Sequence, residues 1–347
     1  MTKTAHLRMT SEVGDPYKRG TDYPPQDDNL ESFVKNWERY SKRLIVFLGA
    51  GASVGAVNKL GRRLPQAYEL RNELYSEFLL PPEQRKGFDL SNLSLLSLEH
   101  TAALAEAGGD RRSIEEFVAE RFLVKRPLWQ HAVLPFLNPL AVFTTNYDNL
   151  IELGWSLHTG RDEIKPLHTL FRETSKLNDD FVPLYKSHGT VELPHKKPGS
   201  GGLVISQFDY FEMIPQRKEM LDQFTSDFNE NCFLAIGYSF QDVDMASRLY
   251  EIRKDRSGRN WYAVFPRNSP VVRDMYYDKY KIKQINRTFH DFLLDLDERV
   301  NFIPEEWKFD RIDELIARGL IYGGERAGKN KAGGRTAAKK AAKRRAR

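Results

Sequence analysis

The amino-acid sequence predicts an α/β fold in which helices cover both faces of a parallel β-sheet. Short, continuous apolar runs recur at residues 43–48, 140–144, 232–236 and 261–265. Such runs are typical of strands that are buried on both faces of a parallel sheet. Segments with helical spacing of apolar residues lie between these runs, and an alternation of strands with helices favours a parallel sheet.

The elements follow one another in a consistent order along the chain. A first helix is predicted at 30–41, where Phe33, Val34 and Trp37 have helical spacing, and the first strand follows at 43–48. The long stretch before the second strand holds mostly helical patterns, so we expect a helical insertion at about 64–138. Further helices are predicted at 67–79, 94–107, 113–123, 209–228 and 242–253.

Composition places the chain among globular proteins. Its 347 residues, of which 40% are hydrophobic and 29% charged, exclude a wholly disordered or fibrous chain. No apolar run approaches the roughly 20 residues of a transmembrane helix, and the polar N-terminus does not resemble a secretory signal. We therefore expect a cytoplasmic protein without membrane contact. The single Cys232 excludes an intrachain disulfide and a zinc site of four cysteines.

The positive net charge comes from one end of the chain. Residues 326–347 hold ten Lys or Arg and no acid, and the remaining 43 basic and 48 acidic residues give a net charge of −5. We expect a polar lead-in at 1–28, a folded body at 29–323 and a disordered basic tail at 324–347. The tail suits contact with nucleic acid, since each neutralised phosphate releases counterions, but a merely solubilising end explains it equally well.

The first candidate motif directly follows the first strand. Gly49, Ala50 and Gly51, with Ser53 behind them, let the backbone turn tightly and approach a ligand, as in Rossmann-like folds. Their free N–H groups would then face a phosphate at the start of the next helix. A tight turn without a ligand explains the same glycines. The third glycine of the dinucleotide fingerprint is missing, and the absence of Gly-Lys-Ser/Thr excludes a Walker loop.

The second motif follows the second strand. Ligands of open parallel sheets lie outside the carboxyl ends of the strands, so Thr145, Asn146 and Asp148 are placed to face one. Asn146 and Asp148 could hold ribose hydroxyls or a water molecule. The alternative is that they form a turn and cap a helix at 149–153.

Two more motifs follow later strands. His188 lies between a strand-like segment and Gly189, where a neutral imidazole suits a general base, although a structural histidine is the alternative. Residues 237–239, Gly-Tyr-Ser, follow the strand at 232–236. Asp242 and Asp244 come next, and the dipole of the helix that they precede is sufficient to explain both carboxylates.

Taken in order, these four motifs resemble the sirtuin fold. Gly-Ala-Gly-Ala-Ser, Thr-Thr-Asn-Tyr-Asp, Lys-Ser-His-Gly and Gly-Tyr-Ser-Phe-x-Asp most closely resemble the bacterial sirtuin-like NAD hydrolases of antiphage defence, over about residues 43–265. The resemblance implies a role for each motif. It implies that Gly49, Ala50, Gly51 and Ser53 bind the NAD pyrophosphate, and that Asn146 and Asp148 hold the nicotinamide ribose and its water, with Thr145 beside them as a further NAD-binding residue. It also implies the catalytic base at His188 and the adenosine half at Gly237, Tyr238 and Ser239.

The departures from protein-deacylating sirtuins are equally informative. Those enzymes carry four zinc-binding cysteines, and this chain has one cysteine, so the zinc module is absent. Their Asp-Phe-Arg stretch is replaced by Arg-Arg-Leu-Pro-Gln-Ala-Tyr-Glu-Leu at 62–70. This segment is similar to the Leu-Pro-x-x-x-Glu-Leu pattern of the NAD-hydrolysing branch.

The resemblance implies an NAD glycohydrolase that uses NAD as substrate, without zinc, and produces nicotinamide and ADP-ribose. A cyclic product stays open. It also implies a triggered antiphage effector that depletes cellular NAD, acts as a homo-oligomer and works with a partner protein such as a HerA-type ATPase. Two other classes stay open: an NAD-dependent protein deacylase, and a nucleic-acid-binding protein whose sirtuin-like fold only senses NAD.

Overall fold

A computed structural model describes residues 28–86, 93, 95–170, 180–191, 202–240, 242–254, 261–266 and 270–308. Within these residues, seven parallel strands form one sheet in the order β3-β4-β2-β1-β5-β6-β7. The predicted α/β class with a parallel sheet is confirmed. The predicted lead-in, apart from residue 28, and the basic tail lie outside the described residues, so both stay predictions.

The strands include all four that the apolar runs predict. Their bounds are β1 Leu44–Leu48, β2 Ala141–Thr144, β3 Leu167–Leu170, β4 Val182–Lys186, β5 Cys232–Ile236, β6 Trp261–Val264 and β7 Ile282–Ile285.

The helices lie mostly where helical spacing predicts them. Their bounds are α1 Asp28–Lys35, α2 Trp37–Tyr40, α3 Ala67–Leu74, α4 Leu98–Gly108, α5 Arg111–Phe122, α6 Trp129–Val133, α7 Leu150–Ser156, α8 Gln207–Gln216, α9 Lys218–Glu230, α10 Val243–Lys254, α11 Pro270–Tyr280 and α12 Phe289–Val300. The prediction of a single helix is wrong in two places. The helix predicted at 30–41 is divided at Asn36, and the one predicted at 209–228 is divided at Arg217. Every helix of the described part is too short or too polar to cross a membrane.

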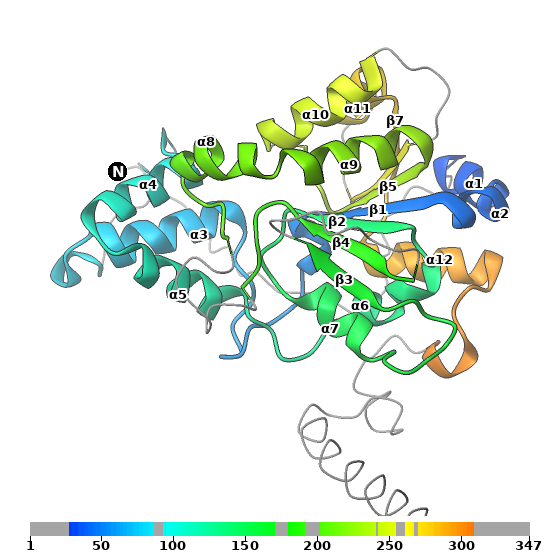
Figure 1. The fold of residues 1–347 in the computed structure, drawn as a ribbon, viewed down its shortest axis with the longest axis horizontal. Coiled ribbons are helices and arrows are strands. Elements are labelled where there is room, and N and C mark those ends of the chain that lie inside the picture. The colour runs from blue at the N-terminus through cyan, green and yellow to red at the C-terminus, as the bar shows by residue number, and fades with distance from the viewer. Residues whose placement is uncertain are drawn as a thin grey trace, which may run out of the picture.

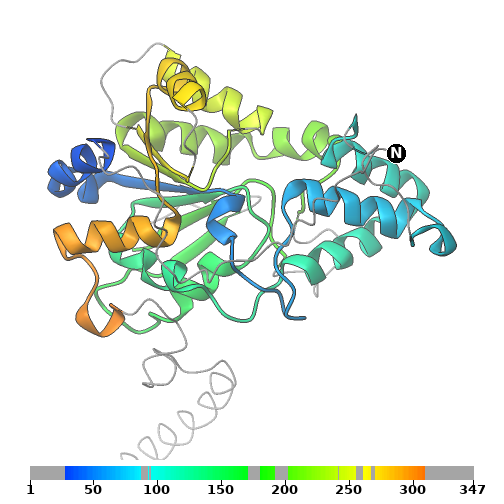
Figure 2. The ribbon, with the colours of Figure 1, turned by 180° about the vertical axis from the view of Figure 1, so that it is seen from behind.

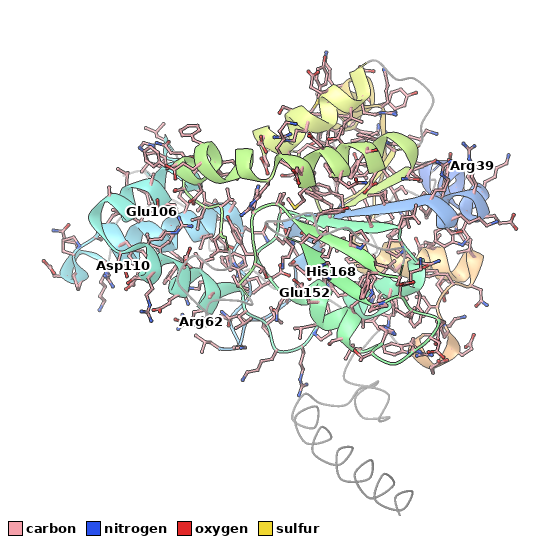
Figure 3. All side chains as sticks on the ribbon, in the orientation of Figure 1. Arg39, Arg62, Glu106, Asp110, Glu152 and His168 are labelled. Carbon is pink, nitrogen blue, oxygen red and sulfur yellow. The ribbon has the colours of Figure 1, made fainter. Side chains whose placement is uncertain are left out.

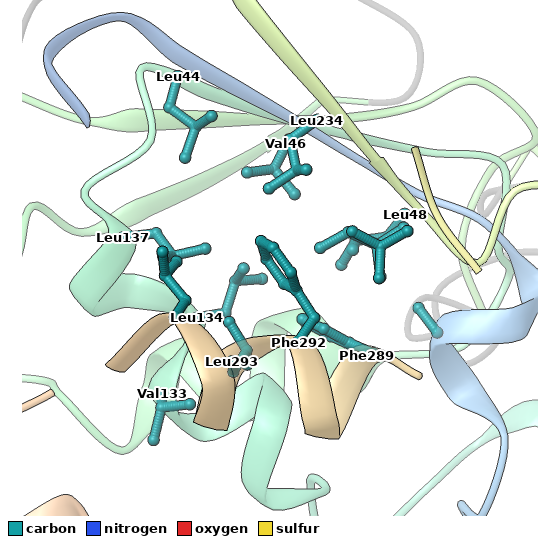
Figure 4. Packing of buried hydrophobic residues seen from close by; sticks show 14 of the residues in the cluster. Leu44, Val46, Leu48, Val133, Leu134, Leu137, Leu234, Phe289, Phe292 and Leu293 are labelled. Carbon is teal, nitrogen blue, oxygen red and sulfur yellow. The ribbon is translucent and has the colours of Figure 1, made fainter. Parts of the chain in front are cut away.

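The sheet buries both of its faces, which explains the continuous apolar runs. Leu44, Val46 and Leu48 of β1 point to the face covered by α6 and α12 (Figure 4). Ile45 and Phe47 point to the opposite face and pack in one cluster with side chains of α9 and α10. These two helices lie over that face of the sheet (Figure 1). Full burial of one such apolar side chain contributes about 1.5–3 kcal/mol, so both helical layers stabilise β1.

The strand order reverses at β1. The chain passes from β1 to β2 on one side of it by way of α6, and later returns by way of α8 and α9 to β5 on the other side. In open parallel sheets, ligands bind outside the carboxyl ends of the strands at such a reversal. The loops after β1 and β5 are therefore the expected binding position.

Helices α3, α4 and α5 do not cover a face of the sheet. They lie beside it, next to the turn that follows β1 (Figures 1 and 2). Their apolar side chains form a cluster of their own, together with Tyr147, Val191, Leu203 and Ile205 from the loops at the carboxyl edge. This helical segment therefore packs on the loops that carry the candidate motifs.

A glycine in α7 sets how closely α6 and α7 pack. A Cβ atom at Gly154 would lie 2.2 Å from the carbonyl oxygen of His131, whereas one at Gly108, at the end of α4, would meet nothing within 4 Å. We expect Gly154→Ala to lower the free energy of unfolding by about 1–3 kcal/mol through overpacking. Gly108→Ala should leave it unchanged or raise it by up to about 1 kcal/mol. Urea denaturation measures both, and equal midpoints for the two variants would contradict this packing.

Candidate active site

The loops after β1 and β5 are in direct backbone contact. The N–H of Gly51 donates to the carbonyl oxygen of Gly237 at 2.8 Å. A Cβ atom on Gly51 would lie 2.8 Å from the Cα of Gly237, and one on Gly237 would lie 2.3 Å from the nitrogen of Ala52. Gly237 also has a φ of +64°, which favours glycine. Glycine is therefore required on both sides of the contact.

This contact corrects one expectation about the first motif. The N–H of Gly49 donates to the carbonyl of Ile236 at 2.9 Å, and that of Gly51 is already used by Gly237. The prediction that the glycine N–H groups are free to face a phosphate is wrong for both glycines, because the last residue of β5 accepts one N–H and the loop after β5 accepts the other. Ala50 and Gly51 nevertheless lie exposed on the turn, while Ser53 is buried.

The loop after β2 is tied to the loop after β1 by side chains. The amide nitrogen Nδ2 of Asn146 donates to the carbonyl of Gly49 and to Oγ of Ser53, both at 3.0 Å. Ser53 Oγ donates in turn to Oδ2 of Asp148 at 2.8 Å. Thr145, just before them, is half-buried. The structure thus brings the first two motifs together.

Asp148 is held from three directions. Its Oδ1 accepts from the N–H of Leu150 at the start of α7. The alternative that Asp148 caps a helix therefore holds for one of its two carboxylate oxygens. Nζ of Lys186, which is fully buried at the end of β4, donates to the carbonyl of Asp148 at 2.5 Å and lies 2.9 Å from Oε1 of Glu152 (Figure 3). Burial raises the pKa of the Asp148 carboxyl, and the Lys186 ammonium opposes that shift.

His188 lies beyond the end of β4 and is 7% exposed. Its ring contacts the rings of Tyr147 and Tyr210, with centroids 6.4 and 5.4 Å away. Its Nε2 lies 3.4 Å from Oδ2 of Asp242 and 3.5 Å from the hydroxyl of Tyr210. Burial lowers the pKa of the imidazole below its ordinary value, and Asp242 only partly offsets this, so the ring is neutral at pH 7.

Four loops, after β1, β2, β4 and β5, therefore meet at one edge of the sheet. Residues 140–285, which include the last three loops, match the family model of the SIR2-like domain. This match covers less than half of the chain. The match begins one residue before β2, so the glycine turn after β1 lies outside it.

Comparison with known proteins gives two relatives with a named activity. The NAD(+) hydrolase ThsA of Cytobacillus dafuensis is 28% identical over 240 residues, which cover 68% of this chain and 43% of the relative. The NAD(+) hydrolase ThsA of Acinetobacter baumannii (strain 532279) is 25% identical over 239 residues, 68% of this chain and 44% of the relative. The chain thus spans less than half the length of these relatives.

Solved structures show a more distant similarity. A Sir2 homologue in complex with NAD is 18% identical, with a TM-score of 0.45 over 82% of this chain and 97% of that chain. A second Sir2 structure is 18% identical, with a TM-score of 0.43 over 79% of this chain and 98% of that chain.

The structure places two more residues against His188, Tyr210 and Asp242, that the sequence did not single out for the site. Tyr210 comes from α8, and no local pattern signals its contact with a loop 22 residues earlier. Asp242 was explained by the helix dipole, and its Oδ1 does cap α10 by accepting from the N–H of Met245 at 3.3 Å. The Gly-Tyr-Ser segment at 237–239, shortly before Asp242, is the sequence signal that could have indicated a role in the site for the second carboxylate oxygen of Asp242.

The fourth motif consists of Gly237, Tyr238 and Ser239, and these residues differ in how far they are exposed to solvent. Tyr238 is buried and packs on Phe47, with ring centroids 4.4 Å apart, so its side chain belongs to the core. Gly237 is half-buried in the backbone contact. Ser239 exposes its side chain, while its carbonyl accepts from the hydroxyl of Tyr276 at 2.7 Å.

The Leu-Pro-x-x-x-Glu-Leu segment forms the start of α3. Glu69 and Gln66 form a capping box at this helix end, and the Glu69 carboxylate also pairs with Arg63. Arg62 is exposed. This segment therefore has a structural explanation in the described contacts.

Cys232 is buried in β5, where burial raises the pKa of its thiol to about 12. The thiol therefore stays protonated and is a poor metal ligand. Among the described residues, no group of three or more His, Cys, Asp or Glu side chains is placed to hold a metal ion.

The Lys186–Glu152 pair lends itself to a stability test. Lys186→Met leaves the Glu152 charge without its partner, and we expect it to lower the free energy of unfolding by about 3–5 kcal/mol, as for other broken buried pairs. The double variant with Glu152→Gln should recover part of this loss. Lys218→Met, which breaks the exposed pair with Asp222, should cost much less because solvent screens it. Urea denaturation that ranks Lys186→Met no worse than Lys218→Met would contradict the buried pair.

Proposed function

We propose that this protein is an NAD glycohydrolase, which cleaves the bond between nicotinamide and ribose and releases nicotinamide and ADP-ribose. The observation that carries the proposal is the meeting of the four loops at the reversal of the strand order, with Asn146 and a neutral His188 among them. The match to the SIR2-like family model and the two relatives named NAD(+) hydrolases support it.

The chemistry of the substrate does not require a pair of carboxylic acids at the site. The nicotinamide ring of NAD is a cation before the bond breaks and leaves as a neutral molecule, so no strong general acid is needed. Ordinary glycosidases, in contrast, use two carboxyl groups. An NAD glycohydrolase must instead orient the ribose, stabilise an oxocarbenium-like transition state and deliver water.

Asn146 and His188 suit the two central tasks. The Nδ2 of Asn146 is fixed by two hydrogen bonds, and its Oδ1 has no hydrogen-bond partner among the described residues. We assign this oxygen to the attacking water and the ribose hydroxyls. The neutral imidazole of His188 accepts a proton as the new bond forms.

The remaining loop residues hold the dinucleotide around these two. The Asp148 carboxylate, fixed by Ser53 and Leu150, favours the positive charge that develops on the ribose. The exposed backbone at Ala50 and Gly51, with Gly49, Ser53 and Thr145 around it, lies at the pyrophosphate and ribose, and Gly237, Tyr238 and Ser239 form the adenosine side.

The biological part of the proposal rests on the resemblance of the motifs. An NAD hydrolase that is always active would poison its own cell, so we propose a triggered antiphage effector. We further propose that it acts in the cytoplasm as a homo-oligomer, with a HerA-type ATPase as a partner and with the basic tail as a contact for nucleic acid.

Substitution of the two central residues tests the activity. We expect His188→Ala and Asn146→Ala each to lower NAD cleavage by at least about a hundredfold, since each removes a base or a positioning group. His168→Ala, on the edge strand β3 (Figure 3), is the control and should retain wild-type cleavage. Chromatography of nicotinamide, ADP-ribose and cyclic ADP-ribose measures the rate and the product. Folded variants at positions 188 and 146 with wild-type turnover would remove both assignments.

The pH dependence follows from the lowered pKa of His188. A base acts only while it is neutral, and burial lowers the pKa of this imidazole below its ordinary value of about 6.5. We therefore expect kcat/KM to fall toward acidic pH with a midpoint below about pH 6.5. Nicotinamide release as a function of pH is the measurement, and an acidic midpoint above about 6.5 would contradict a buried base.

A further inference from the structure

Asp242 carries a second carboxylate oxygen that helix capping leaves unexplained. Its Oδ1 caps α10 through the N–H of Met245. Its Oδ2 is buried and accepts no hydrogen bond from the described residues, yet it lies 3.4 Å from Nε2 of His188. A buried carboxylate oxygen without a partner costs free energy, so a hydrogen-bond donor or a positive charge is expected opposite it.

The neighbouring acid serves as a comparison. Asp244 lies in the first turn of α10, two residues after Asp242, but its Oδ2 faces Nε of Arg248 at 3.6 Å, one turn along the same helix. The helix dipole acts on both acids alike. The approach to His188 is specific to Asp242.

Several further groups face His188 from the elements packed around it. They are Asp242 just before α10, Asp244 of α10, Tyr210 of α8, Arg217 between α8 and α9, Tyr147 of the loop after β2, and Glu99 of α4. Of these, Asp242 is the acid that lies within ion-pair distance of the ring. It therefore dominates the local field that favours a protonated imidazole.

We propose that Asp242 is the positioning residue of His188: its Oδ2 accepts the Nε2–H of the ring, so that the lone pair on Nδ1 is the proton acceptor. This assignment rests on the proposed NAD cleavage. The same arrangement, a carboxylate that fixes the tautomer of a histidine base and stabilises its protonated form, operates in Ser-His-Asp sites. The 3.4 Å separation is long for a hydrogen bond, as is common in sites without substrate.

The proton and electron balance of the step is complete. The bond between ribose C1′ and the nicotinamide nitrogen breaks, its electron pair stays on that nitrogen, and a bond from the water oxygen to C1′ forms. One proton of the water passes to Nδ1 of His188 and later to solvent. Asp242 stays ionised and stabilises the imidazolium while it exists.

The pH profile of cleavage separates positioning from a structural role. Asp242→Asn keeps the helix cap, since Asn caps as well as Asp, but it removes the charge opposite the ring. We expect kcat to fall at least about tenfold at the plateau, and the acidic limb of kcat/KM to move to lower pH, because the imidazole loses the carboxylate that raises its pKa. The matched control Asp244→Asn should shift the limb less.

Titration of the His188 ring by NMR in the full-length protein provides a readout that needs no activity. Comparison with His188→Gln identifies its signal among the eight histidines. We expect a lower titration midpoint in Asp242→Asn than in the wild type. An unchanged midpoint together with an unchanged acidic limb would overturn the positioning role while leaving NAD cleavage in place. A wild-type protein that releases no nicotinamide at any pH would instead contradict the proposed function, and the NMR midpoint would still decide whether Asp242 and His188 interact.

Discussion

Two loop backbones touch at the carboxyl edge of the sheet, and the positions of the candidate site residues depend on that contact. Gly51 and Gly237 allow the loops after β1 and β5 to share a hydrogen bond at a distance that leaves no room for side chains. With the first loop fixed in this way, the carbonyl of Gly49 and the hydroxyl of Ser53 hold the amide of Asn146. The main structural role of Gly51 and Gly237 is therefore to let the two loops approach each other closely.

Charged side chains that are fully or partly buried fix the surroundings of Asp148 and His188. Lys186 at the end of β4 holds the carbonyl of Asp148, so the loop after β2 is tied to the strand that leads to His188. On the far side, Arg111 of α5 pairs with Asp209, which caps α8 by accepting from the N–H of Ser206. Because Tyr210 follows Asp209 directly, the helices between β1 and β2 help to set the surroundings of His188.

The sequence predicted the central strands and missed the outer ones for a physical reason. β1, β2, β5 and β6 are buried on both faces and therefore show continuous apolar runs. β3 lies at an edge and is mostly half-buried, and β7, Ile-Lys-Gln-Ile, exposes part of one residue at the other edge, so neither produces such a run. Burial alone does not produce such a run: β4 is buried throughout, but its sequence, Val-Pro-Leu-Tyr-Lys, ends in a lysine, and the sequence indicated it only as a strand-like segment before His188.

The residues of the candidate site likewise fall into those that local sequence patterns predict and those that they do not. Residues that follow a strand, such as Asn146 and His188, were found because every carboxyl end meets the same edge. The contacts of Tyr210, Lys186 and the second oxygen of Asp242 arise only from the packing of distant elements, which no local pattern records. The use of the glycine N–H groups by carbonyls at the end of β5 and just after it is also a long-range feature, and it was misjudged for that reason.

The central claim is that the four loops bind one dinucleotide. Hydrogen–deuterium exchange of the His188→Ala protein, with and without NAD, tests it most directly, because the ligand stays intact during the measurement. The account predicts slower exchange in the loops after β1, β2, β4 and β5 together, and unchanged exchange around α1 and α2 at the opposite end of β1. Protection confined to one loop, or found only away from this edge, would contradict it.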